Sequence, residues 1–426
     1  MKPIQAVCYV IIACFSVVEA VAQSGWCLQS SGTTAVLWGV SFTNVTTGIA
    51  VGNWGSILRT TNGGTTWLSQ SSGTAENLSG VCFTDANTGT AVGGGGTILR
   101  TTNGGASWAS QSSNTTDLLI AVSFTDANTG TAVGDYGNIL RTTNGGATWT
   151  RQPSGTTNAL RGVCFTDAKS GIAVGAGGTI LRTTDGGASW TAKLSGTADQ
   201  LYGVAFSGAN HGIVVGGIVD GEFRNESVIL LTFDGGASWI SRTAPTTKGL
   251  DAVCFADAHT AYAVGARFWR ESDNRSGVVI RTTDSGKSWT LLLDSTAVLW
   301  GVSFKDSSNG TVVGSGGTIL RTTTGGVTWV EGNQHGDIPQ EYMLNQNYPN
   351  PFNPSTTIKY ELLHDSYMGL TVYDVLGREV SVLVNDRRDA GFHEVMFDGS
   401  GLASGVYLYR LTAGSVVQTR RMILIR

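Results

Sequence analysis

Aspartate residues recur at one place in this chain, and they are the first groups that could do acid–base chemistry. Asp185, Asp234 and Asp284 each stand five residues before a tryptophan. Two carboxylates about 5 to 9.5 Å apart, flanking a sugar linkage, would make a glycoside hydrolase. Related stretches of the chain carry a different residue at this place, namely Asn62, Asn103, Asn144 and Thr324. Because Asp and Asn both accept backbone N–H groups in tight turns, we predict a structural role for the three aspartates and no catalytic residue.

Further carboxylates lie in two insertions, residues 216–228 and 265–278, which contain Glu222, Glu226, Glu271 and Asp273. Insertion loops seldom hold groups within the tolerance that catalysis requires. The chain has no G-x-S-x-G motif, P-loop or zinc-ligand spacing, and its five histidines are scattered. We therefore expect no metal, no cofactor and no enzyme activity. A polysaccharide-acting glycoside hydrolase is the alternative.

The same insertions and their counterparts carry aromatic and basic side chains that suit ligand binding. These residues are Trp54, Tyr136, Arg267, Phe268, Trp269 and Arg270. Exposed aromatic rings near charges are typical of sugar and protein recognition. We predict a ligand site at these six residues. The alternative is that they decorate surface loops and pack their rings onto the fold.

A repeated arginine forms a second candidate site. It occupies one position in six related stretches, at Arg59, Arg100, Arg141, Arg182, Arg281 and Arg321, whereas Leu231 stands there in another. One interpretation is a strut that donates to backbone carbonyls or stacks on a neighbouring ring. The other is a basic ring that grips an anionic partner.

These residues all belong to one repeated unit, and the repeat predicts the elements that position them. The unit ends at tryptophans spaced 40 to 50 residues apart, namely Trp67, Trp108, Trp149, Trp190, Trp239, Trp289 and Trp329. Each unit reads as four short strands punctuated by Gly, Asn and Asp. Such a unit is one propeller blade, and seven of them form a ring. Residues 26–33 have a sequence similar to that of residues 67–74, so a spare outer strand at the N-terminus could close the ring. Eight outer-strand candidates then serve seven blades.

The cysteines predict neither disulfides nor a metal site. Cys82, Cys164 and Cys254 share one position of the repeat, which holds Ser or Ala in the other units. Equivalent positions in non-adjacent repeats should lie beyond the roughly 7 Å Cα separation that a disulfide tolerates. We expect inert thiols in a small, buried position.

Charge and hydropathy exclude several classes of protein. Hydrophobic residues make up 41% of the chain, enough for a sizeable core, so wholesale disorder is excluded. The net charge of −4 argues against a nucleic-acid binder, which would show a basic stripe.

Residues 1–22 read as a signal peptide ending at Ala20-Val21-Ala22. The alternative is a lipid-modified Cys14. No transmembrane segment is expected in the mature chain.

Composition changes after the last repeat. Residues 23–330 are expected to form the propeller and residues 331–340 a linker. Residues 341–426 alternate apolar and polar positions with turn signals every 8 to 12 residues, which predicts a small Ig-like β-sandwich. The predicted fold class is therefore all-β, a seven-bladed β-propeller followed by a sandwich.

Two resemblances sharpen these expectations. Residues 183–190, 232–239 and 282–289 resemble the Asp-box of sialidase-like BNR propellers. The repeat as a whole, with segments such as Ile98-Leu99-Arg100-Thr101-Thr102-Asn103-Gly104-Gly105, resembles the photosystem II assembly-factor repeat family. That resemblance implies an arginine patch that docks a partner protein, and it says little about activity.

The C-terminal segment resembles the type A sorting domain of the type IX (Por) secretion system, from Asn347-Tyr348-Pro349-Asn350-Pro351-Phe352-Asn353-Pro354 to the basic-flanked tail. The resemblance implies that residues 341–426 engage the type IX secretion machinery. It also implies that the protein crosses the periplasm and becomes secreted or bound to the outer cell surface. We predict an exported glycan- or protein-binding, or scaffold, module whose ligand the sequence leaves open.

Overall fold

The computed structural model describes residues 25–217, 227–267, 276–327, 342–347, 349–414 and 416–425. The chain divides into two compact units, Met1–Trp329 and Val330–Arg426. The predicted signal peptide (1–22) and linker (331–340) lie outside the described residues. Among the described residues, no helix has the length and apolar character needed to span a membrane.

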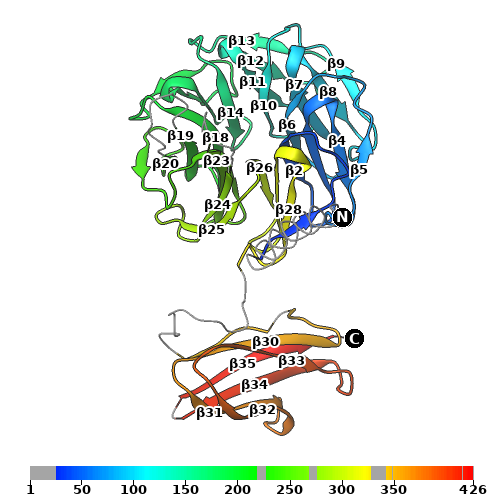
Figure 1. Cartoon of the computed structure of the whole chain (residues 1–426), viewed down its shortest axis with the longest axis vertical. Coiled ribbons are helices and arrows are strands. Elements are labelled where there is room, and N and C mark those ends of the chain that lie inside the picture. The colour runs from blue at the N-terminus through cyan, green and yellow to red at the C-terminus, as the bar shows by residue number, and fades with distance from the viewer. Residues whose placement is uncertain are drawn as a thin grey trace, which may run out of the picture. The chain divides into compact units, whose positions relative to one another are not determined.

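The first unit is a ring of four-stranded antiparallel sheets, as Figure 1 shows. Blade 1 contains, from the axis outward, β2 (Leu37–Phe42), β3 (Gly48–Gly52), β4 (Ile57–Thr60) and β5 (Leu68–Gln70). Strand β3 is buried along its whole length, whereas two of the three residues of β5 are exposed. A continuous apolar run such as that of β3 is typical of a strand covered on both faces.

Five further blades repeat this order. Blade 2 contains β6 (Leu78–Phe83), β7 (Gly89–Gly93), β8 (Ile98–Thr101) and β9 (Ala109–Gln111), and blade 3 contains β10 (Leu119–Phe124), β11 (Gly130–Gly134), β12 (Ile139–Thr142) and β13 (Thr150–Gln152). Blade 4 contains β14 (Leu160–Phe165), β15 (Gly171–Gly175), β16 (Ile180–Thr183) and β17 (Thr191–Lys193), and blade 5 contains β18 (Gln200–Phe206), β19 (Gly212–Gly217), β20 (Ser227–Thr232) and β21 (Ile240–Arg242). Blade 6 contains β22 (Gly249–Phe255), β23 (Ala261–Arg267), β24 (Ser276–Thr282) and β25 (Thr290–Ser295).

The seventh blade is closed by the N-terminus of the propeller. It contains β26 (Leu299–Phe304), β27 (Gly310–Gly314), β28 (Ile319–Thr322) and, as outer strand, β1 (Cys27–Gln29). Cys27 pairs with Arg321 and Gln29 with Ile319. In Figure 1 the blue N-terminal strand meets the yellow strands of this blade. The spare outer strand seen in the sequence therefore closes the ring, and Trp329 lies outside the described residues.

The core of the ring lies between blades. One cluster combines Trp67 and Phe42 of blade 1 with Val313 and Ile319 of blade 7. In blades 1 to 5 the box tryptophan packs edge-on against the phenylalanine that ends the inner strand of its own blade, as Trp67 does with Phe42 at 6.0 Å between ring centroids. This burial ties each blade to its neighbour and accounts for the tryptophan in the repeat.

The two ends of the blades form two distinct faces because consecutive strands run antiparallel. The box face carries the turns between third and fourth strands, such as residues 61–67 of blade 1. The turn face carries the links between blades and the turns between second and third strands. Those turns are η1 (Asn53–Gly55), η2 (Gly94–Gly96), η3 (Asp135–Gly137), η4 (Ala176–Gly178) and η5 (Ser315–Gly317).

The second unit is a sandwich of two antiparallel sheets. One contains β29 (Met343–Leu344), β30 (Ser355–Leu362) and β33 (Gly391–Asp398). The other contains β31 (Ser366–Asp374), β32 (Glu379–Arg388), β34 (Gly405–Ala413) and β35 (Val416–Leu424). Alternate residues of β30 are buried, which is what one buried face per sheet requires. Together with the propeller, this sandwich confirms the predicted all-β fold class.

The proline-rich opening of the sandwich is held by a buried amide. Asn347 Nδ2 donates to Pro349 O and to Thr356 Oγ1, both at 3.0 Å. The Asn347 N–H donates to the Tyr409 hydroxyl at 2.8 Å, and that hydroxyl donates to Asn345 O at 2.8 Å. The motif is therefore part of the sandwich structure and fastens its entry strand to β34.

Candidate functional site

The repeated arginines lie at the box face and reach toward the next blade. Arg59 Nε of blade 1 donates to Gly104 O of blade 2 at 2.7 Å. Arg182 Nε of blade 4 makes the same bond to Gly235 O of blade 5, also at 2.7 Å. Each contact satisfies a carbonyl in the neighbouring box turn, so these two arginines fasten adjacent blades together.

Two other arginines use a different carbonyl of the neighbouring blade. Arg100 Nη2 donates to Ala127 O, and Arg321 Nη2 donates to Val45 O at 2.9 Å across the closure of the ring. Each guanidinium also lies over a phenylalanine ring of that blade, at 4.8 Å for Arg100 and 5.4 Å for Arg321. These contacts support the strut interpretation. Arg141 and Arg281 are half-buried, and the basic-ring interpretation of the six remains a prediction.

Blades 5 and 6 contact the next blade through other side chains, although blade 6 retains Arg281, whose guanidinium lies over the Tyr262 ring, 5.8 Å from its centroid. Tyr262 of blade 6 points its hydroxyl at Ser307 O (3.0 Å) and Gly325 O (3.1 Å) of blade 7. These carbonyls are the seventh-blade equivalents of the two kinds that the arginines bond. At Leu231 of blade 5 the contact with the next blade is apolar. A Cβ added to Gly286 of blade 6 would lie 2.7 Å from the Leu231 side chain, so this side chain packs directly against the backbone there.

The Asp-box carboxylates accept hydrogen bonds from residues of their own turns. Asp234 Oδ1 accepts the Ser238 N–H at 3.0 Å, and Oδ2 accepts the Ser238 hydroxyl at 2.6 Å. Asp284 binds Ser288 in the same way. These bonds to the hydroxyl and the N–H lower the pKa of Asp234 and of Asp284 to about 2. Because a general acid needs a raised pKa, these groups suit the predicted structural role.

Acid should therefore destabilise the propeller through these turns. A carboxyl whose pKa is lower in the folded than in the unfolded chain contributes stability above its unfolded pKa, and that stability is lost as the pH falls through the folded value. For Asp234 and Asp284 the window runs from about pH 4 down to about pH 2, and the lowered pKa of Asp185, which accepts from Ser189, acts in the same direction. Urea unfolding followed by tryptophan fluorescence at several pH values measures the loss. The triple Asp→Asn variant, which copies the box of blades 1 to 3, should show a shallower pH dependence; an unchanged slope would contradict this prediction.

Two of the turns between second and third strands carry an exposed aromatic residue at their centre. Trp54 in η1 is 70% exposed and Tyr136 in η3 is 67% exposed. Both have a φ of 56°, whereas η2, η4 and η5 have glycine at this central position. A bulky residue in the left-handed region is a strained exception. Two of the six predicted ligand residues therefore stand at the same kind of turn and point to the same face.

The other predicted ligand residues belong to the long hairpin of blade 6. Strands β23 and β24 extend toward the turn face as far as the pair Arg267 and Ser276. Phe268, Trp269 and Arg270 lie outside the described residues, as does the side chain of Arg267. Their participation in a site remains a prediction.

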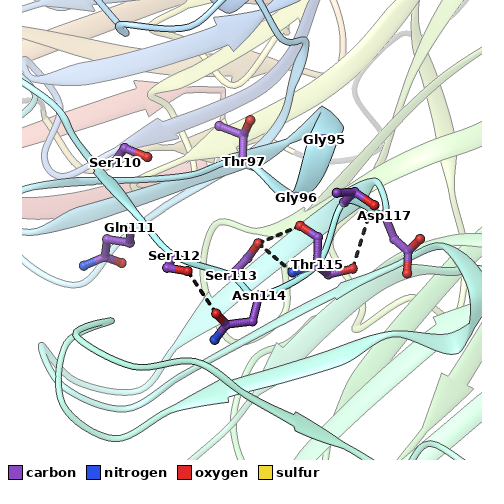
Figure 2. Close-up of a pocket in the computed structure, with 11 residues that line it drawn as sticks. Gly95, Gly96, Thr97, Ser110, Gln111, Ser112, Ser113, Asn114, Thr115 and Asp117 are labelled. Carbon is purple, nitrogen blue, oxygen red and sulfur yellow. Dashed lines mark hydrogen bonds between the residues drawn. The ribbon is translucent and has the colours of Figure 1, made fainter.

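Polar grooves open on the turn face of blades 1 and 2. The groove of blade 2 has a cavity volume of about 670 Å³ and is lined by residues 95–97 and 110–117, drawn in Figure 2. The equivalent groove of blade 1, about 510 Å³, is lined by Trp54 with residues 69–75. Hydroxyl and amide groups dominate both linings. A hydroxyl-rich ligand would find donors and acceptors there, with the Trp54 ring beside the groove of blade 1.

A third group of side chains surrounds the axis of the propeller, and sequence reasoning missed it. Every inner strand contains a β-bulge near its start, so that one residue is skipped in the pairing to the second strand. The skipped residues, called the axial ring here, are Trp38, Ser79, Ile120, Arg161, Tyr202, Asp251 and Trp300. Bulges re-aim side chains and are frequent beside functional sites. All seven are half-buried, so solvent reaches them.

One side of the axial ring is aromatic. The rings of Trp38 and Trp300 lie 4.7 Å apart between centroids. Trp38 Nε1 donates to Asn53 Oδ1 at 2.6 Å, which places the axial ring at the turn face and ties it to the turn that carries Trp54. A Cβ on Gly301 would lie 2.9 Å from Trp38 O, so glycine after the bulge lets these inner strands approach each other.

The axial residues of blades 4 to 6 are polar. The Arg161 guanidinium lies over the Tyr202 ring, 5.5 Å from its centroid. Burial raises the pKa of Asp251 well above its usual range, and the charge of Arg161 offsets only part of that rise. Burial, with the Asp251 charge in a smaller part, raises the pKa of Tyr202 to about 12. Arg161 Nε is buried without a hydrogen-bond partner among the described residues.

A signal for the axial ring was present in the repeat. The residue between a constant leucine and a constant Gly or Ala differs in almost every unit, whereas its neighbours hardly change. Variation at one position of an otherwise regular repeat marks side chains that packing does not dictate. What the sequence could not show is that these residues gather around one axis.

The described residues give little support to catalysis. They contain no group of three or more His, Cys, Asp or Glu that could hold a metal ion. The axial ring includes a single carboxyl, Asp251, and acid–base hydrolysis of a sugar linkage needs two. Cys27, Cys82, Cys164 and Cys254 are free thiols, and burial raises the pKa of Cys164 to about 12, so that thiol stays protonated and unreactive.

Comparison with known families separates the two units. Residues 346–425 match the family described as the secretion system C-terminal sorting domain. Residues 18–110 and 69–156 match photosynthesis system II assembly factor YCF48. Neither family model describes an enzyme. No curated protein matches the chain.

Solved structures share the propeller fold. "YCF48 bound to D1 peptide" superposes with a TM-score of 0.57 at 18% identity, covering 70% of this chain and 95% of the other. YCF48 from Cyanidioschyzon merolae has a TM-score of 0.54 at 21% identity, covering 70% and 98%. The WD40 propeller domain of Doa1 has a TM-score of 0.54 at 13% identity, covering 70% and 97%. The chain thus combines a propeller built of assembly-factor-like BNR repeats with a sorting domain, and the sorting domain implies type IX export to the outer surface or the medium.

Proposed function

We propose that this exported protein is a glycan-binding propeller whose ligand surface is the turn face. The observation that carries the proposal is the pair Trp54 and Tyr136, both exposed and both at a φ of 56°. The chain could relieve this strain with glycine, as it does in η2, η4 and η5. A strained, solvent-exposed aromatic residue is retained where it does something that the fold does not need.

Three features of the same face support a carbohydrate ligand. The grooves beside η1 and η2 are lined by hydroxyl and amide groups. An aromatic ring next to such a lining can stack on the apolar face of a sugar while polar groups bind its hydroxyls. The sequence at the end of β23 and directly after it, in blade 6, adds the predicted ligand residues Arg267, Phe268, Trp269 and Arg270. Export places the propeller where extracellular polysaccharides are available.

Replacing Trp54 with glycine tests the proposal without damaging the fold. The variant restores the residue that three other turns carry, so the free energy of unfolding should stay unchanged or rise by up to about 1 kcal/mol. Loss of the stacking ring should weaken glycan binding by about tenfold or more. A glycan array followed by calorimetry with the best ligand measures both wild type and variant.

The matched control is Leu68→Ala, which removes another exposed apolar side chain, 64% exposed, from β5 of the same blade. It should bind like the wild type. Equal binding by wild type and by the Trp54→Gly, Tyr136→Gly double variant would contradict the proposal. Absence of any glycan binding by the wild-type chain would also contradict it and would favour a protein ligand for this face.

A further inference from the structure

A hydrogen bond links the axial ring to η1. Trp54 directly follows Asn53, and Asn53 accepts the hydrogen bond from the Trp38 indole at 2.6 Å. Trp38 in turn lies beside Trp300. Three tryptophans therefore lead from the groove of blade 1 to the axis. The Trp38 and Trp300 rings are partly covered, whereas Trp54 is exposed.

Around the axial ring, the side chains change from aromatic in blades 7 and 1 to polar in blades 4 to 6. Blades 4, 5 and 6 contribute Arg161, Tyr202 and Asp251. The Arg161 guanidinium, the Tyr202 hydroxyl and the Asp251 carboxyl, whose pKa burial raises well above its usual range, offer hydrogen-bond donors and acceptors. The same ring carries the apolar platform of Trp38 and Trp300, and the combination matches a sugar ring with one C–H face and a rim of hydroxyls.

The geometry points to a saccharide subsite on the axial ring, in which one pyranose unit stacks on Trp38 and Trp300 and directs its hydroxyls toward Arg161, Tyr202 and Asp251. The inference rests on the proposed glycan-binding function and deepens it. From this end unit the glycan extends outward past Asn53, so that further sugar units pass over Trp54 and the groove of blade 1. The axial subsite holds the end unit, and Trp54 holds an outer one.

Ligand length provides the test. The probes are glucose, galactose, mannose and N-acetylglucosamine, each also as its β-linked dimer and tetramer, titrated into the full-length chain by saturation-transfer NMR and calorimetry. Trp300→Ala and Asp251→Asn should weaken monomer and tetramer alike by about tenfold. Trp54→Gly should weaken the tetramer by about tenfold and leave the monomer within twofold.

Two additional variants keep the result interpretable. Asp251→Asn keeps the volume of the side chain, so the test survives if Trp300→Ala fails to fold. Leu194→Ala, at a position 89% exposed in a link of the turn face, should bind every probe like the wild type. Binding that Trp54→Gly weakens but the axial variants do not would overturn the axial subsite and leave the proposed function standing. If the wild-type chain binds no probe of any length, both the subsite and the proposed function fail.

Discussion

Replacing Trp26 with alanine will lower the free energy of unfolding of the propeller by about 3–5 kcal/mol, the range for removing a large aromatic side chain from a core. Trp26 is completely buried. Its ring packs edge-on against Phe304 with centroids 6.1 Å apart. It precedes β1, whose three residues are the outer strand of the last blade. Loss of this anchor weakens the ring at the place where its two ends meet.

Urea unfolding followed by tryptophan fluorescence measures this effect selectively. All twelve tryptophans lie at or before residue 329, so the signal reports the propeller and not the sandwich. The matched control is Leu28→Ala in the same strand, where the side chain is 52% exposed; its effect should stay within about 0.5 kcal/mol. A large loss from Trp329→Ala together with none from Trp26→Ala would contradict closure by β1.

Tyr262→Phe will cost about 1–3 kcal/mol, the penalty for leaving buried polar groups without their partner. The hydroxyl of Tyr262 serves Ser307 O and Gly325 O of the next blade, at 3.0 and 3.1 Å. The variant keeps the ring and its stacking on Phe304, whose centroid lies 3.6 Å away. The expected loss therefore isolates the hydrogen bonds that Tyr262 makes across this interface.

The same fluorescence-detected unfolding measures the Tyr262 variant. Tyr136→Phe is its control, because that hydroxyl belongs to a side chain 67% exposed to solvent and its removal should change stability by less than about 0.5 kcal/mol. If Tyr262→Phe unfolds at the same urea concentration as the wild type, the hydroxyl does not hold blades 6 and 7 together.

Much of the candidate site could be predicted because the repeat fixes local geometry. Trp54 and Tyr136 stand at one position of the repeat, so their presence on one face followed once the blades were recognised. Their left-handed backbone could not be read from the residues, because turn conformation depends on the hydrogen bonds around it; the Trp54 N–H, for example, is held by Asn77 Oδ1 of the next blade at 3.0 Å. The hydrogen-bonded role of the repeated arginines was also among the sequence interpretations, but the carbonyls that they contact became visible only between blades.

The sequence by itself determined the strands, the number of repeats and the sorting domain, because periodic apolar runs, turn glycines and the proline-rich motif act within a few residues of each other. The tertiary structure decided which terminal strand closes the ring and which side chains meet at its axis. Trp38 and Trp300 are far apart in the sequence yet lie 4.7 Å apart, and the Phe42 N–H donates to Ser303 Oγ at 3.2 Å. Such contacts exist only once the first and last blades meet. Their stabilisation depends on closing the whole ring, a property that no local stretch of residues carries.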